Sequence, residues 1–174
     1  MVGKAVPVPG AVARRYKSLL PFGVALVVFA LDQATKIMAA SYLGSANGRE
    51  HLEVIGSWLR FAYVTNSGAA FGILQDRTTL FTIIAFLAIP ILIFFHNSLP
   101  SGGWIAKICV GLLLGGTLGN LVDRVRFGYV VDFIDVGVGN LRWPTFNVAD
   151  SAFVIGVFVL ATYFLTSSEA RRAG

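Results

Sequence analysis

The chain has 174 residues, a length that allows one domain, and 56% of them are hydrophobic while only 13% are charged. Soluble globular chains contain roughly 45 to 50% apolar residues, so this composition argues against a soluble protein and indicates a membrane protein. The net charge of +5 does not predict nucleic-acid binding. The basic residues are thinly spread, and their clusters lie near the two ends of the chain, where anionic lipid headgroups are the expected partner.

Four apolar runs are long enough to cross a bilayer, which takes about 20 mostly apolar residues. They lie at about 19–40, 78–96, 104–122 and 147–166, and we expect them to form four transmembrane helices in a single domain over residues 19–166. Residues 1–18 should be a mobile basic tail and residues 167–174 a basic C-terminal tail. The alternative for residues 1–41 is a cleaved secretory signal, but Asp32, Gln33 and Lys36 interrupt that segment before its small residues.

The segment between the first two runs has the alternation of a β-strand. Along residues 59–65, successive side chains alternate in the pattern of a strand, and turn-forming residues flank this stretch on both sides. Residues 129–136 have the composition of a second short strand. We expect a small extramembrane β-sheet at the outer face, with Trp58, Phe61 and Tyr63 as an aromatic platform at headgroup level. The fold class is therefore an all-α membrane protein with four transmembrane helices and one small sheet.

The third apolar run carries Gly111, Gly115 and Gly119 at spacings of four residues, which places them on one helical face. Such a face lets another helix backbone approach closely, and Ala152 with Gly156 forms a similar notch in the fourth run. Helix packing is the simpler interpretation. The alternative is that the glycine face also admits an extended substrate or a lipid chain.

Polar side chains stand at the ends of the apolar runs, where carboxylates are costly and are therefore candidates for function. In an antiparallel four-helix bundle, the end of the first helix, the start of the second, the end of the third and the start of the fourth lie on one side of the membrane. Those places hold Asp32, Asn66, Asn120, Asp123, Arg124, Asn147 and Asp150.

Two of these positions allow a more detailed expectation. Asn147 suits the N-cap of the fourth helix. Asp32 and Lys36 stand four residues apart and share a helical face. They could form a snorkelling pair at the helix end, or Asp32 could point inward and brace polar groups of neighbouring helices.

The orientation of the chain follows from its basic residues. Four of them precede the first apolar run, whereas Arg49 alone lies shortly after it. Because cytoplasmic flanks are enriched in Lys and Arg, we place both termini in the cytoplasm and the polar residues at the outer face.

The acids indicate a type of chemistry. Two carboxylates close together in a half-dry site cannot both ionise readily, so one keeps a proton while the other can act as a base toward water. Asp132 on the second strand and Asp150 at the top of the fourth helix could form such a pair and perform acid and base catalysis on an amide. Asp123 and Asp32 would then be free to pair with Arg124 and Lys36.

Other arrangements remain open on the residues alone. Asp123, Asp132 and Asp135 could bind Mg²⁺ in a lipid phosphatase or transferase. A transporter or proton pathway also uses intramembrane acids, but it would distribute them through the membrane depth. A zinc site on His51 and His96 is disfavoured because the two lie on opposite sides of the membrane.

Nucleophilic catalysis has less support. Ser67 or Ser151 could act with Lys36 as a Ser–Lys pair, although no histidine base is within reach of either serine. Cys109 lies in the middle of an apolar run with no histidine near it in sequence. We therefore expect a packing role for its thiol and not a reactive one.

Five polar blocks follow one another along residues 32–151: DQATK from Asp32, NSGAAF from Asn66, GNLVDR from Gly119, VVDF from Val130 and FNVADS from Phe146. In this order they resemble the signature blocks of lipoprotein signal peptidase, the type II signal peptidase of bacteria. Five ordered blocks are a specific signal, whereas any one of them alone would be weak.

The resemblance implies an intramembrane aspartic endopeptidase that removes the signal peptide from diacylglyceryl-modified prolipoproteins, cutting before the lipid-bearing cysteine. It implies Asp132 and Asp150 as the catalytic pair. It also implies that residues around this pair bind substrate or shape the site, namely Asp32, Asn66, Asn120, Asp123, Arg124 and Asn147. We add Lys36 and Gly68 to this set, because both lie in the matched blocks.

The resemblance also implies a place and partners. We expect a multi-pass protein of the bacterial cytoplasmic membrane that acts as a monomer without a metal or other cofactor. Its partners should be lipid-modified prolipoproteins, membrane lipids and the cyclic peptide inhibitor globomycin. Residues 1–18 are longer than the family's usual N-terminal segment, so no role carries over to them.

Overall fold

The computed structural model describes residues 18–44, 51–68, 77–99 and 103–172. Its helices are α1 (Leu20–Leu43), α2 (Thr78–Ser98), α3 (Trp104–Phe127) and α4 (Val148–Arg172). Each contains a stretch long and apolar enough to cross a membrane, and the described strands form a small antiparallel sheet. The predicted fold class of four transmembrane helices with a small sheet is therefore confirmed.

All four helices run past the ends predicted from the sequence, α2 by only two residues to Ser98, because no residue there interrupts a helix. α1 continues from residue 40 to Leu43, and Gly44 follows it. α3 continues from residue 122 to Phe127 and stops where Gly128 adopts a left-handed φ of 79°, a common helix ending. α4 continues to Arg172, since residues 157–172 contain neither Gly nor Pro. Most of the predicted C-terminal tail is thus helical, whereas residues 1–17 lie outside the described part of the chain.

α3 is the central helix and contacts α1, α2 and α4. Its glycines lie where α1 comes closest. A Cβ atom on Gly111 would be 2.6 Å from the Cβ of Val24, and one on Gly115 would be 2.7 Å from the Cβ of Val28. The glycine face is therefore filled by α1. This confirms close helix packing and contradicts the alternative that the face admits a substrate or a lipid chain.

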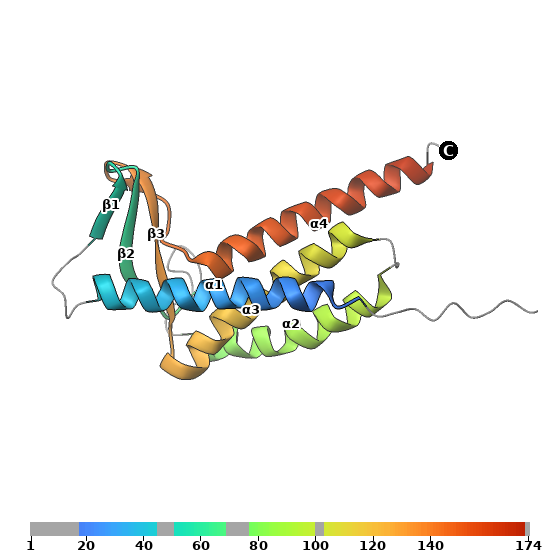
Figure 1. The fold of residues 1–174 in the computed structure, drawn as a ribbon, viewed down its shortest axis with the longest axis horizontal. Coiled ribbons are helices and arrows are strands. Elements are labelled where there is room, and N and C mark those ends of the chain that lie inside the picture. Colours follow the sequence, from blue (N-terminus) through green and yellow to red (C-terminus); the bar gives the residue numbers. More distant parts are fainter. Residues whose placement is uncertain (1–17, 45–50, 69–76, 100–102, 173–174) are drawn as a thin grey trace, which may run out of the picture.

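The sheet consists of β1 (His51–Ile55), β2 (Leu59–Asn66), β3 (Val130–Val138) and β4 (Leu141–Arg142), in that order and antiparallel. The two strands predicted from the sequence correspond to β2 and β3 and are confirmed. β2 and β3 pair from Leu59 opposite Val136 to Asn66 opposite Val130. In Figure 1 the strands run across the helix axes, at the end of the bundle where α1 ends and α4 begins.

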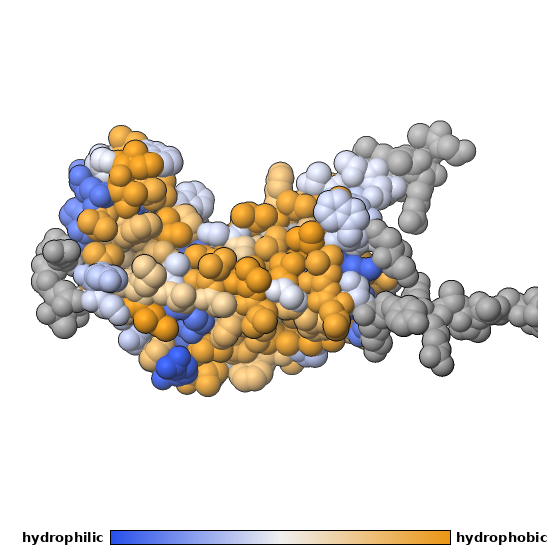
Figure 2. Space-filling model, viewed as in Figure 1, coloured by the Kyte–Doolittle hydropathy of each residue, from blue (hydrophilic) through white to orange (hydrophobic). Residues whose placement is uncertain are grey.

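The surface of the bundle is apolar, as a lipid-facing surface should be. The helices expose large side chains such as Leu26, Leu87 and Phe158, and Figure 2 shows polar colour mainly toward the two ends of the molecule. The predicted aromatic platform is incomplete. Trp58 is exposed, but the ring of Phe61 packs against that of Phe133, with 6.1 Å between their centres, because β2 lies against β3 and α1 at this point.

Candidate active site

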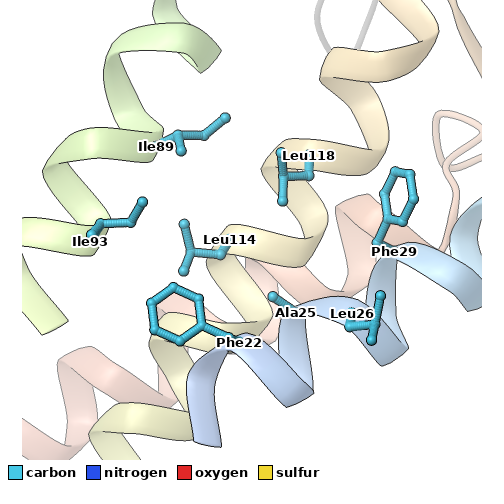
Figure 3. Close-up of a pocket in the computed structure, with 8 residues that line it drawn as sticks. All are labelled: Phe22, Ala25, Leu26, Phe29, Ile89, Ile93, Leu114 and Leu118. Carbon is cyan, nitrogen blue, oxygen red and sulfur yellow. The ribbon is translucent and has the colours of Figure 1, made fainter. Parts of the chain in front are cut away.

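The apolar cavity inside the bundle lacks the chemistry of an active site. It has a volume of about 250 Å³ and lies between α1, α2 and α3, where Phe22, Ile93 and Leu114 are among its lining residues (Figure 3). None of the lining side chains can donate or accept a proton. The polar side chains that could do chemistry lie instead at the sheet end of the bundle.

Lys36 of α1 is the centre of a buried ionic cluster. Its Nζ lies 2.9 Å from Asp32 Oδ2 and 2.9 Å from Asp123 Oδ2, and it donates to Asn120 Oδ1 at 2.9 Å. The three charged side chains are no more than 4% exposed. All three donors of the ammonium are therefore used. Asp32 points inward, and the alternative of a snorkelling pair is wrong because both charges face α3 and not the membrane surface.

The same cluster fixes the two elements that carry the other acids. Asp32 Oδ1 accepts the N–H of Ala149 in the first turn of α4 at 2.9 Å. Asp123 Oδ2 accepts the N–H of Val131 in β3 at 3.2 Å, and Gln33 donates to the other oxygen of Asp123 at 3.0 Å. Buried charges are tolerated when pairing and hydrogen bonding are this complete. α1 and α3 thereby hold the start of α4 and the start of β3 in place.

The predicted pairing of Asp123 with Arg124 is wrong. Consecutive residues on an α-helix point about 100° apart, so the two side chains diverge. Arg124 donates instead to the carbonyls of Asn120 and Gly68, both at 3.4 Å, and its guanidinium lies 5.4 Å from the ring centre of Phe81. Its Nε is buried and has no hydrogen-bond partner among the described residues.

Asn147 caps the N-terminus of α4, as its position in the sequence predicts. Its Oδ1 accepts the N–H of Asp150 at 2.9 Å, and its own N–H donates to Asp150 Oδ2 at 3.2 Å. This reciprocal arrangement is a capping box, which satisfies two N–H groups that a helix start leaves open. It fixes Asp150 in the first turn of α4, where the helix dipole favours a negative charge.

Amide side chains join Asp132 and Asp150 in one network. Asn147 Nδ2 donates to Asp132 Oδ1 at 2.7 Å, and Asn66 Nδ2 donates to Asp132 Oδ2 at 2.9 Å. Asn120 Nδ2 donates to Asp150 Oδ1 at 2.7 Å, while Asn147 Nδ2 also lies 3.1 Å from Asn120 Oδ1. A strand and a helix far apart in sequence thus bring two carboxylates to the same group of amides.

The pKa of Asp132 is raised from 3.8 to about 7. Burial is the main cause, and the negative charge of Asp150 is the second. The hydrogen bonds from Asn66 and Asn147 and the charge of Lys36 act in the opposite direction. A carboxyl group with such a pKa can hold a proton at neutral pH while a neighbouring carboxylate accepts one. Acid and base catalysis on an amide requires this combination.

Asp135 lies outside this network. Arg60 and Arg142 approach its two oxygens to 2.7 and 2.6 Å. Burial alone would raise the pKa of Asp135, but the hydrogen bonds from the two arginines outweigh it and lower the pKa. No group of three His, Cys, Asp or Glu side chains in the described residues could hold a metal ion. A Mg²⁺ site on Asp123, Asp132 and Asp135 therefore has no geometric support.

The nucleophilic and zinc alternatives also lack geometric support. Lys36 is occupied by two carboxylates and an amide, so it cannot serve a serine as a base, and the hydroxyl of Ser151 donates to the carbonyl of Asn147 at 2.9 Å. His51 lies on β1. His96 is buried near the end of α2 against Phe22, with 5.7 Å between ring centres. That end of α2 is the one away from the sheet (Figure 1).

Comparison with known proteins identifies the family. A family model described as Signal peptidase (SPase) II matches residues 24–166. The chain belongs to the signal peptidase II family. A relative from Moorella thermoacetica named lipoprotein signal peptidase is 42% identical over 82% of this chain and 90% of its own length. Another of that name, from Acinetobacter baylyi, is 37% identical over 90% of this chain and 88% of its own length.

Solved structures agree with this signal peptidase II assignment. A bacterial membrane enzyme of known structure is 34% identical and has a TM-score of 0.76 over 85% of this chain and 88% of its own. A second one is 35% identical with a TM-score of 0.73. This signal peptidase II is thus an aspartic peptidase of a bacterial multi-pass membrane type.

Hydrogen bonds and ion pairs connect the ten site residues predicted for this signal peptidase II: Asp32, Lys36, Asn66, Gly68, Asn120, Asp123, Arg124, Asp132, Asn147 and Asp150. Part of the NSGAAF block, residues 69–71, lies outside the described residues. Sequence reasoning missed Gln33, which contacts Asp123 and the carbonyl of Gly119. Its signals were an amide side chain within an apolar run and its place in the DQATK block.

Proposed function

We propose that this signal peptidase II removes the signal peptide from diacylglyceryl-modified prolipoproteins by cutting before the lipid-bearing cysteine, with Asp132 and Asp150 as the catalytic pair. The name of the relatives, lipoprotein signal peptidase, supports the substrate class. One observation carries the mechanism: linked amides orient the two carboxylates, because Asn147 donates to Asp132 and to Asn120, which donates to Asp150, and the pKa of Asp132 is about 7.

In this mechanism the pair shares one proton at neutral pH. The ionised carboxylate takes a proton from a water molecule while the water oxygen attacks the scissile carbonyl carbon, and the protonated carboxyl group gives its proton to the carbonyl oxygen. The resulting tetrahedral diol collapses when the carboxyl group that took the water proton gives it to the leaving nitrogen, the other carboxylate takes a proton from a hydroxyl of the diol, and the C–N bond breaks. Each carboxyl group therefore acts once as a base and once as an acid, the pair again holds one proton, and no covalent bond to the enzyme forms.

The asparagines act on the catalytic pair and not directly on the substrate. The side-chain N–H groups of Asn66 and Asn120 are directed at Asp132 and Asp150, and Asn147 bonds to Asp132 while it caps α4. Carboxylates that accept these bonds cannot rotate freely. The protonated and ionised oxygens are therefore presented in fixed directions, which is the preorganisation that electrostatic catalysis depends on.

Arg124 supplies the donor for the substrate. Its Nε is buried and without a partner among the described residues, and its long bonds at 3.4 Å to Asn120 and Gly68 leave further donor capacity. A guanidinium beside the catalytic pair can bond a backbone carbonyl of an extended substrate or the developing oxyanion. Loss of one such donor typically costs about 10² to 10³ in rate.

The location of the site suits a substrate that is itself held in the membrane. The acids lie where α1 ends and α4 begins, beside the sheet (Figure 1). A signal helix and two acyl chains can stay in the bilayer at that level while the peptide bond between them enters the polar site. The distribution of basic residues supports placing this end of the bundle at the outer face of the cytoplasmic membrane.

The test uses the purified full chain in lipid bilayers. It should release the signal peptide from a diacylglyceryl-modified prolipoprotein, seen as a mass shift, and leave an unlipidated twin intact. Globomycin should block the reaction. Glu53→Gln, which changes an exposed carboxylate on β1, is the matched control for Asp132→Asn. Equal cleavage of both substrates, or full activity of folded Asp132→Asn, contradicts the proposal.

A further inference from the structure

The sheet ends in two hairpin turns that lie side by side. β1 and β2 are joined by Gly56 to Trp58, and β3 and β4 by Gly139 and Asn140. The pairing of Leu59 with Val136 places both turns at the same end of the sheet. The N–H of Gly137 also donates to the carbonyl of Trp58 at 2.9 Å. In Figure 1 this end points away from the helix bundle.

Large apolar side chains cover this end, and we call Ile55, Trp58, Val138, Leu141 and Trp143 the hairpin tip. Their exposed fractions run from 51% for Trp58 to 84% for Leu141, and Figure 2 shows strongly apolar colour at the far end of the sheet. All five lie outside the four membrane-spanning helices. An exposed apolar cluster of this kind marks a surface that binds a membrane or a protein.

Ion pairs and hydrogen bonds hold the hairpin tip in one arrangement. Arg142 Nε lies 2.6 Å from Asp135, and Arg142 Nη1 donates to the carbonyl of Ser57 at 2.8 Å, which ties the second hairpin to the first. Arg60 of β2 holds the other oxygen of Asp135 at 2.7 Å. The exposed apolar side chains are therefore presented by a fixed framework, so little conformational entropy is lost when they bind.

We propose that the hairpin tip inserts into the interfacial layer of the lipid bilayer. The strands cross the helix axes (Figure 1), so the tip is displaced sideways from the bundle at the depth where α1 ends and α4 begins, and does not project straight into water. Lipid headgroups and the upper acyl chains surround a membrane bundle at that depth. Tryptophan concentrates in this layer, because its ring is apolar and its N–H is polar.

The contact would steady the catalytic machinery. Asp132 lies near the start of β3, and Val138 of the hairpin tip is the last residue of the same strand. A tip seated in the interface limits the tilt of β3 relative to α4, which carries Asp150. The proposal rests on the membrane fold, and its test needs no peptidase activity.

The test measures the depth of Trp58 and Trp143 in the full chain. Trp104 is replaced in a Trp104→Phe variant, and the protein is placed in phosphatidylcholine vesicles whose acyl chains are brominated near the headgroup. Bromine should remove most of the tryptophan emission, while iodide in the water should remove little. A Trp58→Phe/Trp143→Phe variant reports Trp104 alone and serves as the matched control.

A second variant keeps the test decisive. Val138→Glu/Leu141→Glu in the Trp104→Phe background makes the tip polar. In this variant, bromine should no longer quench the tryptophan emission and iodide should quench it, while the unfolding temperature stays close to that of the Trp104→Phe parent. Strong iodide quenching with no bromine quenching in the parent overturns the proposal. So does protection from iodide that appears only when a prolipoprotein or another protein is added, because the tip would then be a polypeptide-binding surface.

Discussion

Asn147 contacts both acids of the pair, since its Nδ2 donates to Asp132 Oδ1 and its backbone N–H donates to Asp150 Oδ2. We expect Asp132→Asn and Asp150→Asn each to lower turnover by about 10² to 10⁴ or more, because either change leaves a site without its complementary acid and base. Residues that act as a unit are not additive, so the double variant should be scarcely slower than either single one. Cleavage rates of the three variants, with folding checked by thermal unfolding, decide this.

The profile of turnover against pH should be bell-shaped. The pKa of Asp132 is raised from 3.8 to about 7, so activity should fall as pH rises above about 7 and the shared proton is lost. It should also fall at low pH, when both carboxylates are protonated. The two apparent pKa values in a rate profile belong to the pair. Activity that stays constant from pH 6 to pH 9 would contradict the shared proton.

The same pKa predicts how stability depends on pH. A carboxyl group with a higher pKa in the folded chain than in the unfolded chain favours folding when it is protonated. That contribution is complete below the unfolded pKa of about 3.8 and is lost as pH rises through about 7. Asp132→Asn should therefore reduce the decline of the unfolding temperature between these two pH values.

Lys36 should matter more for stability than any other single charge in the cluster. Lys36→Met leaves Asp32 and Asp123 buried without their counter-ion, and breaking a buried ion pair from one side costs about 3 to 5 kcal/mol. Adding Asp32→Asn should recover part of the loss, because only the carboxylate of Asp123 is then buried without a counter-ion. The amide oxygen at position 32 can still accept the N–H of Ala149. Thermal unfolding of the single and double variants measures the coupling.

The sequence located the polar residues but could not assign their partners. Helix ends and parity were enough to bring Asp132 and Asp150 to one side. Which carboxylate pairs with which cation depends on the directions of side chains on different helices. Lys36 pairs with both Asp32 and Asp123, whereas the prediction from the sequence had paired Asp123 with Arg124. Arg124 Nε has no partner among the residues that the structure describes, and this could not be predicted from the sequence because it depends on what the neighbouring groups already bind.

At the scale of elements, the glycine face determines how close α1 and α3 come. We expect Gly115→Ala to destabilise the fold by about 1 to 3 kcal/mol, the usual cost of overpacking, because the new Cβ would lie 2.7 Å from the Cβ of Val28 and 2.8 Å from the carbonyl oxygen of Ala25. Gly23→Ala in α1 is the matched control, since nothing lies within 4 Å of its new Cβ. Equal unfolding temperatures for the two variants would show that α1 can move away at no cost.

Gly119 shows why packing and site could not be separated from the sequence. A Cβ on this residue would collide with the carboxylate of Asp32, so the missing side chain makes room for the acid that reaches the N–H of Ala149. The spacing of the three glycines predicted a close helix contact. It gave no indication that the last glycine serves the polar cluster, because that depends on where Asp32 points.

At the scale of the whole molecule, the orientation in the membrane remains a prediction that labelling can decide. In a Cys109→Ala background, Gly10→Cys should be protected from a membrane-impermeant maleimide in intact cells, and Glu53→Cys at an exposed position of β1 outside the hairpin tip should be labelled. The reason is the excess of basic residues before α1. The reverse pattern would place both the sheet and the catalytic pair at the inner face.

The buried pair of Asp32 and Lys36 has a consequence for biogenesis. α1 precedes α3 in the chain, so it is synthesised before the helix that receives its charges. Because the two residues are four apart on one helix and 2.9 Å from each other, α1 carries its own counter-ion through insertion and needs no other helix to offset the cost of a charge in lipid. Asp123 then docks onto a cation that is already in place, so the order of translation matches the order in which the cluster can be assembled.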